Sequence, residues 1–177
     1  MLKKIVLSGK TKLNGEIKIS GAKNAALPII VSSLLCNGTL KLSNIPHLLD
    51  ITTLIYLLTH LGVKVRVDGD LSNKGNGKVI ELNGENLTGY NAPYSIVSQM
   101  RASFIVLGPL LARFGKAEVS LPGGCAIGSR PVDIHLTAFE QMGVDITIEE
   151  GYVKASVKDG KLKGANIEFR QPSVGAT

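Results

Sequence analysis

Apolar residues recur at short intervals near the start of the chain, within residues 3–7 and again within residues 16–19. A glycine-containing segment separates them, so the pattern predicts a hairpin with one buried face. An apolar helix is expected next, over about residues 23–36. Pro28 must lie in the first turns of this helix or kink it, because an interior proline removes a backbone hydrogen bond.

The clearest helical pattern lies between Asp50 and Gly62. Its apolar residues share one helical face and are Ile51, Leu54, Ile55, Leu58 and Leu61. We expect Asp50 to cap the amino end of this helix and Gly62 to end it. Strands are predicted on either side, over residues 39–42 and 63–67.

The same order of elements returns in the second half of the chain. The predicted elements are a strand over residues 78–82, a long helix over residues 95–114 bent at Gly108 and Pro109, a strand ending at Leu121, a helix over residues 133–142 and a strand over residues 145–148. The segment Leu61-Gly62-Val63 is echoed 81 positions later by Met142-Gly143-Val144. We interpret this echo as an internal duplication.

The second copy has the longer loop between its strand and its helix. Leu121 and Asp133 are 12 positions apart, whereas Leu42 and Asp50 in the first copy are 8 apart. Loops on a fixed scaffold are frequent places for chemistry, so this insertion is the first candidate for a functional site.

The last predicted elements are a strand over residues 166–169 and a helix cap at Ser173. No helix sequence follows that cap before the chain ends at residue 177. We expect the chain to be the amino-terminal piece of a longer protein; a disordered tail is the alternative.

Composition narrows the classes of function. The chain of 177 residues suits one domain, and its net charge of +6 is spread out rather than gathered in a basic block. Small anions therefore fit better than a polyanion, and aromatic residues at 5% offer few stacking platforms for single-stranded nucleic acid. The two most apolar segments, residues 25–36 and 102–112, are shorter than the roughly 20 residues that span a bilayer.

Cysteine and histidine give no sign of a metal site or a disulfide. Cys36 and Cys125 stand far apart without a Cys-x-x-Cys pattern, which suits a reducing cytosol, and Cys36 is expected to be an inert core residue. The three histidines, at positions 47, 60 and 135, share no ligand spacing. We expect no metal, no cofactor and a cytoplasmic location.

The segment from Pro122 to Pro131 is the most unusual stretch of the sequence. Its glycines allow backbone amides to turn toward an anion, and Arg130 adds a planar fork of donors. A thiol at Cys125 would feel this positive charge, which lowers its pKa and suits it to proton transfer or nucleophilic attack. A plain turn with an incidental cysteine is the alternative reading.

Two further cations are candidates. Lys23 stands at a strand-to-helix junction, where helix amides and an ammonium can share one phosphate, although an isolated lysine is usually only solvated. Arg101 lies in an apolar helical segment and needs a partner, which is either a ligand or a structural carboxylate.

These residues resemble a known family, the UDP-N-acetylglucosamine 1-carboxyvinyltransferases. The resemblance covers essentially the whole chain, and its most specific part is the Gly-Gly-Cys loop followed by Arg130-Pro131-Val132-Asp133. The matching segments are Ser20 to Pro28, Met100 to Ser103, Leu107 to Phe114, Ser120 to His135, Glu149 to Ser156 and Ser173 to Thr177. The sister enzyme, 5-enolpyruvylshikimate-3-phosphate synthase, shares the fold but lacks the cysteine loop.

The resemblance implies an α/β fold, an inside-out α/β barrel built from βαβαββ units and incomplete in this chain. It assigns residues 1–21 to an amino-terminal hairpin that belongs to the second domain of the full enzyme. Residues 22–177 would form most of the first domain, and the active site would lie between the two domains. The missing carboxy-terminal half would supply the base and further arginines, so the chain alone should be inactive.

The resemblance also implies roles for individual residues. Cys125 would be the general acid. Phosphoenolpyruvate would be bound by Lys23, Asn24 and Arg130. The UDP-sugar would be contacted by Arg101, Arg130, Pro131, Val132, Asp133, Ile134, Ser173 and Val174, and Asp50 would support the catalytic centre. Gln171-Pro172 replaces a Lys-Val pair of some members, which leaves the nucleotide contact there open.

The implied reaction transfers the enolpyruvyl group of phosphoenolpyruvate to the 3-hydroxyl of UDP-N-acetylglucosamine, the first committed step of peptidoglycan precursor synthesis. Both substrates are small molecules, and fosfomycin would target Cys125. Two other functions remain open from the sequence: a basic βα-repeat module that binds nucleotide or RNA, and a non-catalytic product of a split gene.

Overall fold

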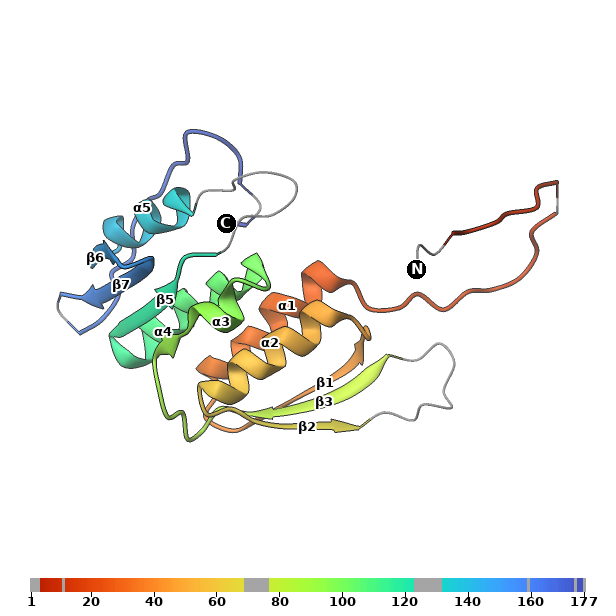
Figure 1. Cartoon of the computed structure of the whole chain (residues 1–177), viewed down its shortest axis with the longest axis horizontal. Coiled ribbons are helices and arrows are strands. Elements are labelled where there is room, and N and C mark those ends of the chain that lie inside the picture. The colour runs from red at the N-terminus through yellow and green to blue at the C-terminus, as the bar shows by residue number, and fades with distance from the viewer. Residues whose placement is uncertain are drawn as a thin grey trace.

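Two successive units with the same order of helices and strands make up the fold (Figure 1). The computed structural model describes residues 4–10, 12–68, 77–122, 132–158, 160–173 and 175–176. The first unit contains α1 (Lys23–Val31), the 3-10 helix η1 (Ser32–Leu35), β1 (Thr39–Ile45), α2 (Leu49–His60), β2 (Lys64–Asp68) and β3 (Lys78–Asn83). The second contains β4 (Asn91–Ala92), α3 (Tyr94–Val97), the 3-10 helix η2 (Arg101–Val106), α4 (Leu107–Phe114), β5 (Lys116–Ser120), α5 (Asp133–Gln141), β6 (Val144–Glu149) and β7 (Tyr152–Val157).

Each unit forms its own sheet, and the two sheets share one topology. The first has the order β1-β3-β2 and the second the order β4-β5-β7-β6. In both, the last strand is antiparallel to its two neighbours and lies between them, so a helix connects two parallel strands that do not touch. The predicted duplication is therefore confirmed, and the second unit has the full βαβαββ order because β4 runs parallel to β5.

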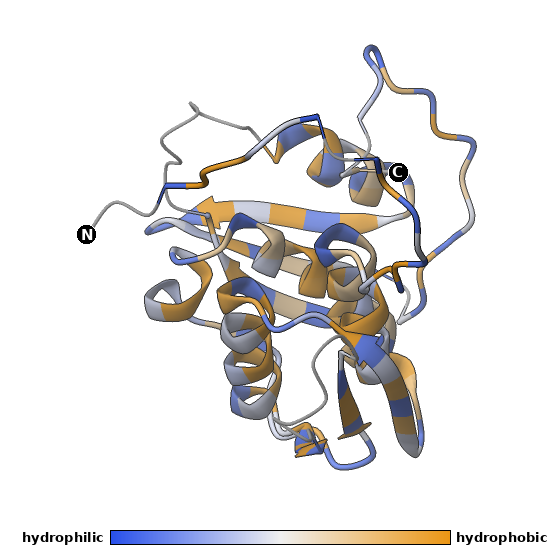
Figure 2. Ribbon diagram, turned by 90° about the vertical axis from the view of Figure 1, so that its right-hand side faces the viewer, coloured by the Kyte–Doolittle hydropathy of each residue, from blue (hydrophilic) through white to orange (hydrophobic). Residues whose placement is uncertain are grey.

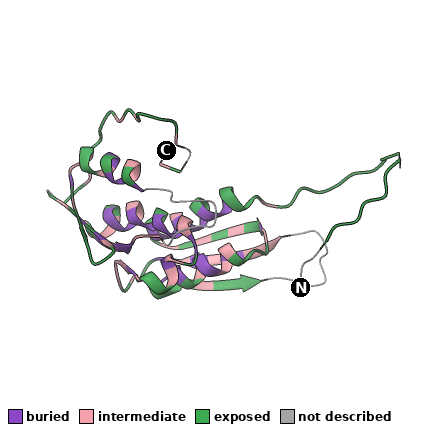
Figure 3. Ribbon diagram, turned by 45° about the horizontal axis from the view of Figure 1, so that its top comes forward, coloured by how far each residue is buried: buried purple, intermediate pink, exposed green. Residues whose placement is uncertain are grey.

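One face of each sheet is apolar and packs on helices, while the other is polar. In the first sheet the register places Leu82 between Leu40 and Val65 on one face. The next row, on the opposite face, is Lys41, Glu81 and Arg66. Strict alternation of this kind follows from the two-residue period of a strand. The buried residues consequently gather between helices and sheets (Figure 3), and hydrophobic residues alternate with hydrophilic ones along the strands (Figure 2).

The two helix ends identified by the repeated Leu/Met-Gly-Val segments have the same backbone geometry. Gly62 has φ +99° and Gly143 has φ +87°, a region that residues with a side chain rarely adopt. Each glycine follows its helix and turns the chain into the next strand, β2 or β6. The prediction that glycine ends the helix before β2 is confirmed.

The prediction of one long helix over residues 95–114 is wrong. The chain forms α3, η2 and α4 instead, with i to i+3 hydrogen bonds such as Met100 N–H to Val97 O at 3.2 Å between them. Gly108 and Pro109 do not bend a helix, because they lie in the first turn of α4, where proline loses no intrahelical bond. The first helix is confirmed, although its end tightens into η1.

The predicted amino-terminal hairpin with a buried face does not form within the described residues, and its assignment to a second domain stays a prediction. No strand forms in residues 4–10 or 12–22, and the segment extends away from both sheets (Figures 1 and 3). Its apolar side chains are 77–91% exposed: Ile5, Val6, Leu7, Leu13, Ile17 and Ile19. An alternating apolar and polar pattern forms a strand only where a neighbouring strand can pair with it, and the described residues provide no such neighbour for this segment. The strand predicted over residues 166–169 is absent for the same reason.

Two smaller expectations change. Asp50 does not cap α2, since the N-cap position is Leu48 and Asp50 lies in the first turn. Cys36 is half-buried rather than fully in the core, and its Sγ lies 3.4 Å from Ser32 O. Among the helices in the described part of the chain, none is long and apolar enough to cross a bilayer.

Candidate functional site

The start of α1 is anchored by a close approach of two backbone segments. Gly21 N–H donates to Asn44 Oδ1 at 3.2 Å, and Asn44 lies at an irregularity of β1 with φ +57°. A Cβ at Gly21 would lie only 2.0 Å from Asn44 O, so only glycine fits. This contact fixes the position from which Lys23 projects, two residues later.

Lys23 pairs with Asp50 across the starts of α1 and α2. The Lys23 Nζ to Asp50 Oδ2 distance is 2.8 Å, and the two side chains are 47% and 35% exposed. No side chain caps the amino end of α1, and Asn24 beside it is exposed. An accessible ion pair is worth at most about 1 kcal/mol, so an anionic ligand can displace or share the carboxylate at little cost. Lys23, Asn24 and Asp50 together form what we term the α1 group.

A second group forms where α5 begins. Val132 is buried and serves as the N-cap residue, Asp133 is exposed in the first turn and Ile134 is half-buried. His135 Nε2 lies 2.9 Å from Gly175 O, which joins this helix to a segment 40 positions away. Within that segment, Ala176 N–H lies 3.3 Å from Ser173 Oγ.

Arg101 lies close to the same histidine. Burial lowers the pKa of His135 below its ordinary 6.5, and the Arg101 charge lowers it further. Hydrogen bonds to the backbone of Gly175 and Val132 and the Asp133 charge raise it, but burial outweighs them. The ring also packs edge-on against Phe104, with centroids 5.9 Å apart. The structure thus gathers Arg101, the start of α5 and the turn at Ser173 around one imidazole, and we term these the α5 group.

The two groups are linked through packing. Helix η2, which begins at Arg101, contacts α1, which begins at Lys23. Four predicted site residues lie outside the described residues and carry no structural statement here: Cys125, Arg130, Pro131 and Val174. The first three lie between β5 and α5 in the sequence.

Sequence reasoning missed Asn44 and the role of His135. The asparagine gave no signal, because its positive φ depends on the irregular pairing of β1 with β3. The sequence singles out His135 only as an unlikely metal ligand. Its neighbours in the sequence do not predict the hydrogen bond to Gly175, 40 positions away. Within the described residues, no three His, Cys, Asp or Glu side chains gather in a way that would hold a metal ion.

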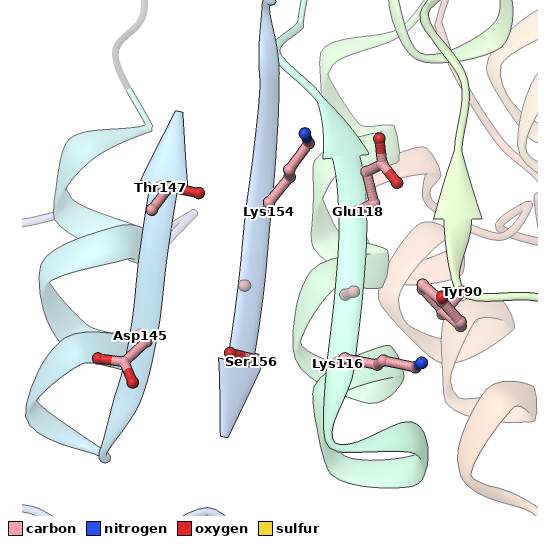
Figure 4. Close-up of a pocket in the computed structure, with 9 residues that line it drawn as sticks. Tyr90, Lys116, Glu118, Asp145, Thr147, Lys154 and Ser156 are labelled. Carbon is pink, nitrogen blue, oxygen red and sulfur yellow. The ribbon is translucent and has the colours of Figure 1, made fainter. Parts of the chain in front are cut away.

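A shallow cavity of about 270 Å³ lies elsewhere, on the polar face of the second sheet (Figure 4). Lys116 Nζ sits 4.4 Å from the Tyr90 ring centroid there, and Lys154 pairs with Glu149 at 2.6 Å. None of the predicted site residues lines this cavity. It is the solvated outer face of the sheet, where Lys154 and Asp145 are in ion pairs and Lys116 lies over an aromatic ring.

Two successive α/β units, each with its last strand between two antiparallel neighbours, define the fold class. The sequence pattern of the EPSP synthase (3-phosphoshikimate 1-carboxyvinyltransferase) family matches residues 7–177. The chain therefore belongs to this family of carboxyvinyl transferases.

Curated relatives are more specific. The chain is 55% identical to a UDP-N-acetylglucosamine 1-carboxyvinyltransferase of Paramagnetospirillum magneticum, over 98% of this chain and 40% of that protein. Proteins with the same name from Rhodospirillum centenum and Serratia proteamaculans are each 53% identical, over 98% of this chain. The chain thus spans about 40% of the length of these relatives.

Solved structures confirm the fold class. The enolpyruvyl transferase NikO from Streptomyces tendae superposes with a TM-score of 0.68 at 18% identity, over 88% of this chain and 32% of that chain. An EPSP synthase from Acinetobacter baumannii gives a TM-score of 0.53 at 17% identity, over 80% of this chain and 32% of that chain. At this identity the likeness concerns the fold, and it agrees with an incomplete barrel of the expected type.

Proposed function

We propose that this chain forms part of an enzyme that transfers the enolpyruvyl group of phosphoenolpyruvate to the 3-hydroxyl of UDP-N-acetylglucosamine and releases phosphate. The observation that carries the proposal is the 55% identity, over 98% of the chain, to a curated relative of that name. Each of the two groups contains one cation, Lys23 at α1 and Arg101 near α5, and two cations at separate places suit two anionic substrates.

The α1 group is proposed to bind phosphoenolpyruvate. Lys23 offers an ammonium and the start of α1 offers uncapped amides, both suited to a phosphate. Asn24 would add an amide donor, and Arg130 would hold the phosphate from the other side. Asp50 would keep the ammonium oriented before the substrate arrives.

The α5 group is proposed to bind the UDP-sugar. Arg101, the segment from Arg130 to Ile134 and the pair Ser173 and Val174 would contact it. A multiply charged diphosphate is best matched by a guanidinium, which donates in a planar fork.

Cys125 is proposed as the general acid. The sugar 3-hydroxyl oxygen bonds to C2 of phosphoenolpyruvate while the thiol gives its proton to C3, and the hydroxyl proton passes to a base. In the second step a proton leaves C3, the C2–O bond to phosphate breaks and the C2–C3 double bond returns. A thiol with a pKa near the working pH can serve both steps, because it both gives and recovers a proton.

The rest of the active site is proposed to come from polypeptide that corresponds to the remaining length of the relatives. That portion would supply the base and further arginines, so the chain alone would be inactive. Residues 1–21 would pack as a hairpin on this second domain, which would cover the exposed apolar side chains of the arm. Residues 22–177 would form most of the first domain.

The cellular role follows from this reaction. We place the enzyme in the cytoplasm, at the first committed step of peptidoglycan precursor synthesis, and thus among proteins needed for cell wall formation, shape and division. Fosfomycin would inactivate it through Cys125.

The test is release of phosphate from phosphoenolpyruvate by the complete enzyme with either of two acceptors. We expect release with UDP-N-acetylglucosamine and none above background with 3-phosphoshikimate, the acceptor suggested by the description of the matching family. Cys125→Ala should abolish the release. Activity with 3-phosphoshikimate alone, or normal turnover by the alanine variant, would overturn the corresponding assignment.

A further inference from the structure

His135 joins three segments that are far apart in the sequence. It lies in the first turn of α5, its Nε2 is 2.9 Å from Gly175 O, and its ring packs edge-on against Phe104 of η2. Figure 1 shows α5 beside the described carboxy-terminal residues.

The geometry fixes the protonation state of the ring. A carbonyl oxygen only accepts hydrogen bonds, so the Nε2 atom must carry the proton. Nδ1 is buried and makes no hydrogen bond of good geometry among the described residues, although the backbone of Val132 lies near enough to favour a proton on the ring. A second proton there would place a charge on a half-buried ring; burial and the positive charge of Arg101 oppose it, and Asp133 and the backbone of Gly175 and Val132 offset this only in part. The neutral tautomer with hydrogen on Nε2 is therefore the stable form at neutral pH.

We propose that His135 is a positioning residue for the nucleotide-sugar site. Its Nε2–H group holds Gly175 against the start of α5, at a ring that also feels the charge of Arg101, so that these residues are arranged before the ligand binds. The inference rests on the function proposed above, because it takes Arg101, Asp133 and Ser173 as parts of one site. His135 itself need not touch the substrate.

The expected effect follows from the cost of ordering a free segment. Without the bond, residues 173–176 must be ordered when the ligand binds, and that cost appears as weaker binding. One hydrogen bond of this kind changes affinity by about three- to tenfold. The loss should fall on the UDP-sugar alone, since the α1 group lies at other helix starts and has its own anchor at Asn44.

Two substitutions separate the hydrogen bond from the packing. His135→Phe keeps an aromatic ring against Phe104 but removes the donor. His135→Gln removes the ring but keeps an amide donor that can reach Gly175 O. In the complete enzyme we expect His135→Phe to raise KM for UDP-N-acetylglucosamine about three- to tenfold, with KM for phosphoenolpyruvate and kcat within about twofold of the wild type. His135→Gln should recover most of the affinity.

Three kinetic outcomes would overturn the inference. An unchanged KM for the UDP-sugar in His135→Phe removes the positioning role. Equal rises in both KM values point to general damage instead. A glutamine variant that is worse than the phenylalanine variant assigns the effect to ring packing rather than to the bond.

Hydrogen exchange gives a readout that does not depend on activity. In the ligand-free complete enzyme, amides of the segment that contains Ala176 should exchange faster in His135→Phe than in the wild type, and at nearly the wild-type rate in His135→Gln. Equal rates in all three proteins would overturn the inference whatever the enzyme binds. A different result would be faster exchange in His135→Phe together with a wild-type enzyme that does not bind UDP-N-acetylglucosamine. That result would overturn the proposed function while supporting the hydrogen bond between His135 and Gly175.

Discussion

Arg113 fastens α4 to both ends of the first unit, and its removal should be costly. Its Nη1 donates to Leu34 O at 2.9 Å and to Cys36 O at 3.2 Å, while Nη2 donates to Glu85 O at 3.0 Å. The first two bonds are partly buried and the third is exposed. Hydrogen bonds to a charged group contribute about 1.5–3 kcal/mol each when buried, and less when exposed. Arg113→Ala should therefore lower the free energy of unfolding by about 3 kcal/mol.

Urea unfolding measures this change as a lower midpoint with an unchanged slope. Arg113→Lys keeps the charge but loses the planar fork, so it should recover only about a third of the loss. Arg66→Ala is the surface control: Arg66 Nε is 3.3 Å from Asp68 Oδ1, with side chains 73% and 53% exposed. Its loss should stay below about 1 kcal/mol. If Arg113→Ala lowers the free energy of unfolding no more than Arg66→Ala does, or if Arg113→Lys is as stable as the wild type, the guanidinium hydrogen bonds do not contribute as proposed.

Three further predictions concern the site and its supports. Gly21→Ala should destabilise the fold by about 1–3 kcal/mol in the same urea assay, because the new Cβ would collide with Asn44 O. Gly38→Ala is the control, since a Cβ there meets nothing within 4 Å and stability should hardly change. In steady-state kinetics, Lys23→Gln should raise KM for phosphoenolpyruvate at least about tenfold and leave KM for the UDP-sugar unchanged; an equal rise in both would contradict the separation of the two groups. Burial holds the pKa of His135 below 6.5, so the unfolded chain takes up the proton first and stability falls as pH drops below that value. Urea midpoints between about pH 7 and pH 5 should fall less steeply for His135→Gln, and parallel curves would refute the assignment.

The repeated architecture was predictable because its signals are local. Gly62 and Gly143 follow apolar helical patterns of similar length, and both have the positive φ that a helix end requires. The period of two in β1 to β3 likewise matches the pairing of Leu40 with Leu82 on one face. Local propensity and long-range pairing agree at these positions, so the sequence alone was enough.

The misses arise where the outcome depends on distant partners. The apolar residues of the arm, such as Ile5 and Ile17, have a strand-like pattern but no partner in the described chain. Helix periodicity runs through residues 95–114, yet the backbone tightens into 3-10 turns near Met100 as it packs against α1 and α2. Such adjustments follow tertiary packing, which a local pattern does not contain.

In the candidate site, too, local signals were predictable from the sequence and long-range contacts were not. Lys23 and Arg101 were found because a cation at a helix start or in an apolar segment is locally conspicuous. The pairing of Lys23 with Asp50, 27 positions away, and of His135 with Gly175 required the fold. The sequence thus predicts the chemistry, while the structure adds which of the described residues lie in contact.

The central claim is that the protein joins an enolpyruvyl group to UDP-N-acetylglucosamine. Its most direct test is mass spectrometry of the nucleotide sugar after incubation of the complete enzyme with phosphoenolpyruvate. The account predicts that the nucleotide sugar becomes heavier by one carboxyvinyl group for each phosphate released, and that Cys125→Ala gives no such product. A nucleotide sugar of unchanged mass, while phosphoenolpyruvate is consumed or a different acceptor gains the group, would contradict it.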